Sequence, residues 1–170
     1  PLTEWLPAPT MQKIAIENNL AETAFFIPQG DDFELRWFTP ELEIDLCGHA
    51  TLATAHILFT ELGYDKDIIH FHTLKAGTLS VTRKDDLYTL DFPSRIATTC
   101  DLPNGLLEAI GGKAPSQILS SRDIMLIYEN EADVLALKPD FAALAKIAIM
   151  GVIATAKGDH SDFVSRFFIP

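Results

Sequence analysis

The sequence predicts an α+β fold built from two related units, and three observations support this. Runs rich in aromatic and β-branched residues recur between turn signals, of which Lys84-Asp85-Asp86 is the clearest. Residues 46–60 carry no charge and are apolar around most of the circumference of a helix, which predicts a buried helix. Three short motifs recur in the same order in the two halves of the chain, which indicates a duplication.

The expected elements follow from periodicity and from Gly and Pro signals. Residues 8–19 predict a helix with Thr10 as N-cap and with Ile14 and Ile16 as its apolar positions. Strands are expected before and after the uncharged helix, and Gly111-Gly112 ends a short helix in the second half. The expected strands are 20–27, 33–38, 42–46, 68–71, 77–82, 87–92, 118–121, 124–128, 151–156 and 163–169; further helices are 106–110 and 141–149, and 93–103 is an irregular linker.

The recurring motifs link the two halves. Their pairs are Lys13-Ile14-Ala15-Ile16 with Lys146-Ile147-Ala148-Ile149, Thr23-Ala24 with Thr155-Ala156, and Arg36-Trp37-Phe38-Thr39-Pro40 with Arg166-Phe167-Phe168-Ile169-Pro170. Chance similarity between two helix–strand–strand segments is the alternative. If the duplication is real, the second counterpart of the uncharged helix is expected just beyond residue 170, and both chain ends look cut.

Composition narrows the classes of function. The chain has 170 residues, is 48% hydrophobic and carries a net charge of −11, so it can bury a core but offers no basic face for nucleic acid. Its two cysteines form neither a disulfide framework nor a zinc spacing, which favours a reducing cytoplasm and predicts no metal site. The uncharged run is shorter than the roughly 20 residues that a membrane span needs, so no membrane partner is expected.

The start of the uncharged helix, Cys47-Gly48-His49, predicts an anion site. The first-turn N–H groups of a helix need acceptors and favour negative charge, so a small carboxylate-bearing molecule fits there. Each residue also has a plain structural explanation: Gly48 as a turn or packing glycine, His49 as a polar first-turn or core residue, and Cys47 as a small core residue. Asp45 is expected to cap the helix.

Glu22 is a lone carboxylate in the apolar stretch 20–27. It either lies on an edge strand facing water, which the pattern alone favours, or is buried, which raises the pKa of a carboxyl and suits it to proton transfer. The matching place in the second repeat, near Ala154 or Thr155, has no carboxylate. Because only one of the two repeats has this acid, we expect Glu22 to have a function of its own.

These residues closely resemble the phenazine-biosynthesis PhzF-like family, relatives of diaminopimelate epimerase. The resemblance spans essentially the whole chain, and the combination of Glu-Thr-Ala-Phe with Cys-Gly-His-Ala-Thr is specific. The matching stretches are Glu17-Asn18-Asn19-Leu20-Ala21-Glu22-Thr23-Ala24-Phe25, Leu35-Arg36-Trp37-Phe38-Thr39-Pro40, Asp45-Leu46-Cys47-Gly48-His49-Ala50-Thr51-Leu52-Ala53 and Asp162-Phe163-Val164-Ser165-Arg166-Phe167-Phe168.

The resemblance implies a diaminopimelate epimerase-like fold of two barrel-like sheets, each around a central helix, with the active site at the helix N-termini. It implies Glu22 as catalytic acid/base, Gly48 and His49 as substrate contacts, no cofactor, and a homodimer. Cys47 stands where diaminopimelate epimerase carries a catalytic thiol, so a thiol role stays open, secondary to Glu22. Cys47 is otherwise counted with the substrate-binding residues.

The family pattern also has parts that this chain lacks. A first strand carrying Asp-Ala-Phe and a Gly-Asn-Pro segment are absent, as is a later Asp-Pro-x-Thr-Gly-Ser motif with a second catalytic Asp. We therefore expect residues 1–98 to form a first domain without its N-terminal strands. Residues 99–170 are expected to begin a second domain without its central helix.

Three functions follow as hypotheses. The leading one is a cofactor-independent isomerase or epimerase that moves a proton on a small carboxylate-bearing metabolite. The second is a hot-dog-like thioester hydrolase, which also wraps a sheet around a buried helix but has no duplication across separate domains. The third is a non-catalytic small-molecule-binding protein.

Overall fold

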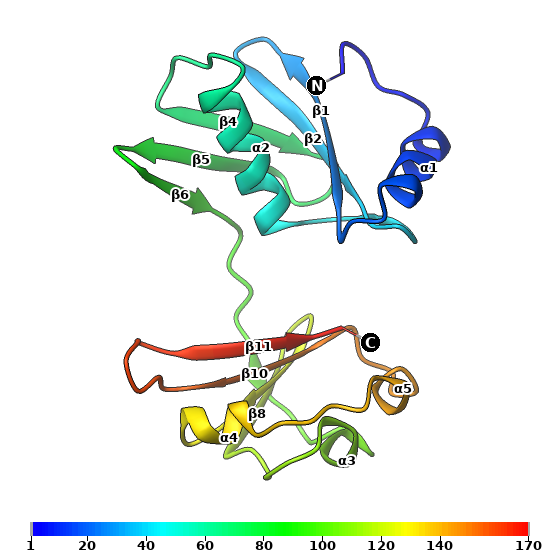
Figure 1. Cartoon of the computed structure of the whole chain (residues 1–170), viewed down its shortest axis with the longest axis vertical. Coiled ribbons are helices and arrows are strands. Elements are labelled where there is room, and N and C mark those ends of the chain that lie inside the picture. The colour runs from blue at the N-terminus through cyan, green and yellow to red at the C-terminus, as the bar shows by residue number, and fades with distance from the viewer. Residues whose placement is uncertain (1, 170) are drawn as a thin grey trace. The chain divides into compact units, whose positions relative to one another are not determined.

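The computed structural model describes residues 2–169 and divides the chain into two compact units (Figure 1). Unit 1 is Pro1–Pro93 and unit 2 is Ser94–Pro170. Each has its own sheet and its own hydrophobic core. The boundary expected at residue 98 lies inside the two-residue strand β7 (Thr98–Thr99), which pairs within the sheet of unit 2.

Unit 1 contains a six-stranded sheet with one helix packed on its inner face. The strands run in the order β1-β2-β4-β5-β6, and β3 pairs with β2. Neighbours are antiparallel except β2 and β4, whose parallel pairing needs a crossover that α2 (Gly48–Thr60) supplies. The strand bounds are β1 (Thr23–Gln29), β2 (Asp32–Phe38), β3 (Glu43–Ile44), β4 (Ile68–Thr73), β5 (Thr78–Lys84) and β6 (Leu87–Asp91).

Helix α2 packs one face against the inner face of this sheet and contacts both outer strands, β1 and β6. Its buried residues are Ala50, Thr51, Thr54, Ala55, Leu58 and Phe59, packed over Trp37, Phe71 and Leu79. The prediction of burial around most of the helix is wrong for the described residues. The sheet covers one side only, so His49, His56 and Ile57 on the other side stay exposed.

Helix α1 (Ala8–Asn18) covers the outer face of β1 and β2. It begins after Pro7 without a side-chain cap, so the prediction of Thr10 as N-cap is wrong. Met11 and Ala15 pack against Phe25 and Phe38, whereas the expected apolar positions, Ile14 and Ile16, are exposed. The face that meets the sheet therefore lies one residue away from the predicted one.

Unit 2 holds a five-stranded sheet in the order β11-β10-β9-β8-β7 and three short helices. The bounds are β8 (Gln117–Ser120), β9 (Ile124–Ile127), β10 (Val152–Ala156), β11 (Val164–Phe168), α3 (Leu106–Ile110), α4 (Glu131–Leu135) and α5 (Phe141–Leu144). The predicted helix 141–149 is wrong in length, because Ile149 N–H donates to the carbonyl of Ile147 in a turn beyond α5. Helix α4 was not predicted, although Asn130 caps it.

Each unit contains its own antiparallel strand pair, β1–β2 in unit 1 and β10–β11 in unit 2, and the second strand of each pair carries Arg-aromatic-Phe. Arg36 lies over the Phe38 ring at 5.3 Å and Arg166 over the Phe168 ring at 4.8 Å. The Lys-Ile-Ala-Ile pair does not correspond in structure, because residues 13–16 lie in α1 and residues 146–149 in the turn beyond α5. The Thr-Ala pair does not correspond either, because the strand registers match Thr23 with Val152 and not with Thr155.

The strand registers give the correct correspondence between the repeats. Arg36 pairs with Phe25, and Arg166 pairs with Ala154. The residue that matches Glu22 is therefore Gly151, three positions before the one expected. A Cβ at Gly151 would lie 2.7 Å from the Phe167 ring, so that place in unit 2 cannot hold a carboxylate without displacing the ring.

No helix among residues 2–169 is long and apolar enough to span a membrane.

The core of unit 1 can be tested with a matched pair of leucines. Leu79 is fully buried on β5, whereas Leu87 on β6 is 74% exposed. We expect Leu79→Ala to lower the free energy of unfolding of unit 1 by about 2–5 kcal/mol, because it leaves a cavity. Leu87→Ala is expected to change it by less than about 0.5 kcal/mol. Urea titration followed by circular dichroism measures both, and equal losses would contradict the assigned core.

Candidate active site

Glu22 lies immediately before β1 and points to the helix side of the sheet. Successive side chains of a strand alternate between faces, and Ala24 and Phe26 both belong to the core around α2. Glu22 shares their face. Its side chain is 17% exposed and its Oε2 atom is buried. The prediction of a buried carboxylate is therefore the one that the structure supports over an edge position facing water.

Helix α2 begins without a side-chain cap. Cys47 is its N-cap in an extended conformation, and no side-chain oxygen accepts from the first turn. The amides of His49 and Ala50 are near enough to the Cys47 thiol to lower its pKa, but no side chain forms a cap hydrogen bond with them. Sulfur is a weak acceptor, so these donors remain available to a better one, and the positive end of the helix dipole favours an anion there.

Glu22, Cys47 and His49 form one cluster at this helix end. His49 Nε2 lies 2.6 Å from Glu22 Oε2, and Cys47 Sγ lies 3.7 Å from Nδ1 and 3.9 Å from Nε2 of the same ring. The imidazole is not aligned for a hydrogen bond to Oε2, so no described residue gives that buried oxygen an aligned donor. The sequence prediction that these residues belong to one site agrees with this proximity.

Burial raises the pKa of the Cys47 thiol above its ordinary value. The charge of Glu22 raises this pKa further, while the Ala50 and His49 amides lower it. Burial is the largest of these effects, so Cys47 is a protonated thiol at neutral pH. In that form it can donate a proton but is a poor nucleophile.

Gly48 is not required by the backbone. Its φ lies outside the left-handed region, and a Cβ there would meet only Phe92, at an ordinary 3.6 Å. Neither strain nor crowding within unit 1 demands a glycine.

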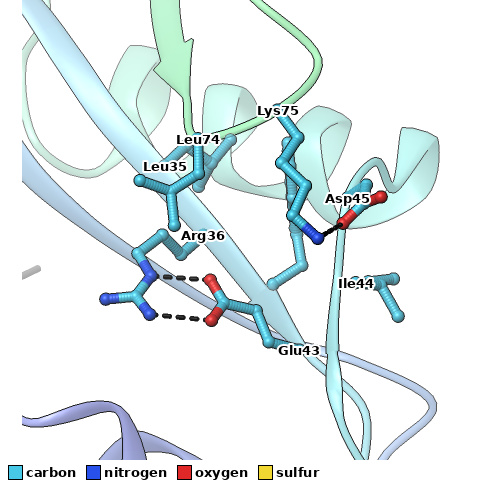
Figure 2. Close-up of a pocket in the computed structure, with 8 residues that line it drawn as sticks. Leu35, Arg36, Glu43, Ile44, Asp45, Leu74 and Lys75 are labelled. Atoms are coloured by element: carbon cyan, nitrogen blue, oxygen red, sulfur yellow. Dashed lines mark hydrogen bonds and ion pairs between the residues drawn. The ribbon is translucent and has the colours of Figure 1, made fainter.

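A hollow of about 80 Å³ lies next to the chain that leads into α2 (Figure 2). Its cations are already neutralised: Arg36 donates two hydrogen bonds to Glu43, both 2.7 Å, and Lys75 lies 2.9 Å from Asp45. Asp45 therefore pairs with Lys75 and does not cap the helix, contrary to the prediction. The hollow is lined by Leu35, Arg36, Trp37, Glu43, Ile44, Asp45, Leu74 and Lys75.

A second hollow of about 230 Å³ shares Leu35, Arg36 and Leu74 with the first. Neither hollow includes Glu22, Cys47 or His49, and of these three residues only His49 is exposed. We place the candidate site at the cluster because it joins a carboxylate, a thiol and an imidazole at an uncapped helix start, whereas the cations of the first hollow are paired.

The ion pairs around the first hollow hold the lead-in to α2 in place. Arg36–Glu43 joins β3 to β2, and Lys75–Asp45 joins the next residues to the loop between β4 and β5. The sequence analysis missed both pairs. The alternation along β2, which puts Arg36 on the face opposite Trp37, was the available signal for the first; the second joins residues far apart in sequence and had none.

The chain matches the family described as phenazine biosynthesis-like protein, PhzC-PhzF, over residues 3–170. It belongs to this family, and its fold is diaminopimelate epimerase-like. An uncharacterized isomerase of Pseudomonas aeruginosa is 45% identical over all of this chain and 65% of its own length. An uncharacterized isomerase of Halalkalibacterium halodurans is 41% identical over 94% of this chain and 62% of its own length.

The fold also matches a solved structure. A PhzF family protein of Enterococcus faecalis superposes with a TM-score of 0.89 at 46% identity, covering 99% of this chain and 65% of that one. The chain thus spans about two thirds of the length of these relatives, and curated members of the family carry the name isomerase.

The titration of Cys47 tests the electrostatics of the cluster. In a Cys100→Ser background Cys47 is the sole thiol, and we expect its alkylation by iodoacetamide to rise with pH to a midpoint above the ordinary 9.0. Glu22→Gln is expected to lower that midpoint, because it removes a negative charge beside the thiolate. Mass spectrometry of quenched samples gives the rates. A midpoint at or below 9.0, or one that rises with Glu22→Gln, would contradict the assigned effects of burial and of Glu22 on this pKa.

Proposed function

We propose that the protein is a cofactor-independent isomerase or epimerase that moves a proton on a small carboxylate-bearing metabolite. The observation that carries the proposal is the buried carboxylate of Glu22, 2.6 Å from His49 at the uncapped start of α2. An acid/base group and an anion-binding helix end lie together there. The family membership and the relatives named isomerases agree with it.

In this proposal the substrate carboxylate accepts hydrogen bonds from the first-turn amides near Gly48 and His49. Such binding holds the carbon next to the carboxylate beside Glu22, which takes its proton and returns it at another position or face. A positioned acid/base group contributes about 10²–10⁴-fold to a rate. The anion site also stabilises the charge that develops on the carboxylate when the proton leaves.

Glu22 is a better candidate for the base than His49. The His49 side chain is 71% exposed, whereas the Glu22 side chain is 17% exposed and Oε2 lacks an aligned donor. His49 is assigned to substrate contact and to orienting Glu22. Cys47, protonated and within 4 Å of the His49 ring, is assigned to the substrate-binding face, and a part in the chemistry is secondary to Glu22.

The remaining expectations stay proposals. They are a second catalytic Asp beyond residue 170, a homodimer, a cytoplasmic location, and no partner besides the small acid. The proposal invokes no cofactor, as the family resemblance implies.

Two alternatives remain testable. A hot-dog-like thioester hydrolase would cleave acyl thioesters, and a non-catalytic binder would hold a ligand without exchanging its protons. The strand pair repeated in both units and the isomerase relatives favour the first proposal over both. Hydrolysis assays on acyl thioesters test the hydrolase, and incorporation of deuterium into bound acids tests the binder.

Glu22→Gln in the full-length protein tests the assigned base. We expect the rate of deuterium incorporation from heavy water into the substrate to fall by about 10²–10⁴-fold, because an amide cannot accept the proton. Glu17→Gln, an exposed substitution of the same kind on α1, should leave the rate unchanged. Mass spectrometry of small acids incubated with each variant measures exchange. Wild-type exchange in Glu22→Gln would refute the role.

A further inference from the structure

We propose that Glu22, Cys47 and His49 form a binding site for a thiophilic divalent cation of the Zn²⁺ class. The cluster offers a carboxylate, a thiol and an imidazole, and their ligand atoms all lie within 4.8 Å of one another. These are the three ligand types that zinc takes in proteins. The sequence spacing gave no sign of this, because Glu22 lies 25 positions before Cys47 and comes from a different element.

The distances fit one metal ion after a small adjustment. With metal–ligand bonds of about 2.0–2.3 Å, ligand atoms around a tetrahedral ion lie roughly 3–4 Å apart. One imidazole binds one ion through one nitrogen, and through Nε2 His49 lies 3.9 Å from Cys47 Sγ, which already fits. The Glu22 Oε2 to His49 Nε2 distance of 2.6 Å must widen, and the exposed His49 ring is the group free to move.

Burial and charge give the cluster the character of an open metal site. Cys47 is buried and Glu22 is mostly enclosed, whereas the exposed His49 provides an entry path. The Oε2 atom of Glu22 is buried and has no aligned hydrogen-bond donor. A bound metal ion would give this oxygen a partner. Carboxylate and thiolate together balance the charge of a divalent ion, and the thiol proton is released to solvent on binding.

Three protein ligands leave one position of a tetrahedral ion for water. Since the metal would occupy the same groups as the proposed proton transfer, it would compete with the reaction. That consequence rests on the proposed function, whereas the binding of the metal does not.

Cobalt(II) is the spectroscopic probe that tests the site. In the Cys100→Ser protein we expect one equivalent of Co²⁺ to give a thiolate-to-cobalt charge-transfer band and the d–d bands of tetrahedral cobalt. Zn²⁺ should abolish both by displacement. Cys47→Ser should remove the charge-transfer band, and Glu22→Gln and His49→Asn should each weaken Co²⁺ binding at least tenfold.

The control is His56→Asn, a second exposed histidine of α2 that lies outside the cluster and should bind Co²⁺ normally. His49→Asn changes an exposed side chain, so it keeps the test valid even if Cys47→Ser misfolds. Charge transfer that survives in Cys47→Ser, full affinity in His49→Asn, or the absence of any thiolate band would overturn the site.

Measuring deuterium exchange in the presence of metal separates the proposed metal site from the proposed proton-transfer role of Glu22. If Zn²⁺ slows deuterium exchange and a chelator restores the rate, the result supports the use of the same side chains for metal binding and for proton transfer. If cobalt binds at the cluster but exchange continues with bound metal, the metal site stands and the proposed role of Glu22 fails.

Discussion

The candidate site depends on the uncapped first turn of α2. Its amide donors need acceptors, and no side-chain oxygen caps them; Cys47 offers only sulfur. The carboxyl of Glu22 and the ring of His49 lie beside this helix end, 2.6 Å apart. The helix end therefore combines unmet hydrogen-bond capacity with groups that transfer protons, which is the combination that the proposed reaction on a small acid requires.

The rest of unit 1 fixes this arrangement. Strand β1 puts Glu22 on the helix side because it alternates with Ala24 and Phe26, and the sheet holds the helix by its one buried face. The ion pairs Arg36–Glu43 and Lys75–Asp45 join the chain that leads into the helix to β2 and to the loop after β4. In unit 2 the ring of Phe167 fills the space that a carboxylate at Gly151 would need, so the acid belongs to one repeat only.

Strong local signals made much of the fold predictable from sequence. Helix 106–110, the strand pair 118–121 and 124–128, and the Asp85-Asp86 turn follow directly from apolar runs and glycine or polar turn residues. The length of the helix at 141 and the buried face of α1 were wrong, because tertiary packing chose between near-equivalent apolar positions. The cluster was predictable as separate residues, but its 2.6 Å contact depends on strand and helix meeting across 26 intervening residues.

Amide chemical shifts on titration with a small carboxylate give the sharpest test of anion binding at the start of α2. With lactate or benzoate added to ¹⁵N-labelled protein, we expect saturable shifts of the Gly48 and His49 N–H signals. Gly48→Ala should weaken them, because a methyl group adds bulk to the first turn at which the anion is proposed to bind. Unmoved signals at these two residues, with saturable shifts elsewhere in the chain, would contradict the account.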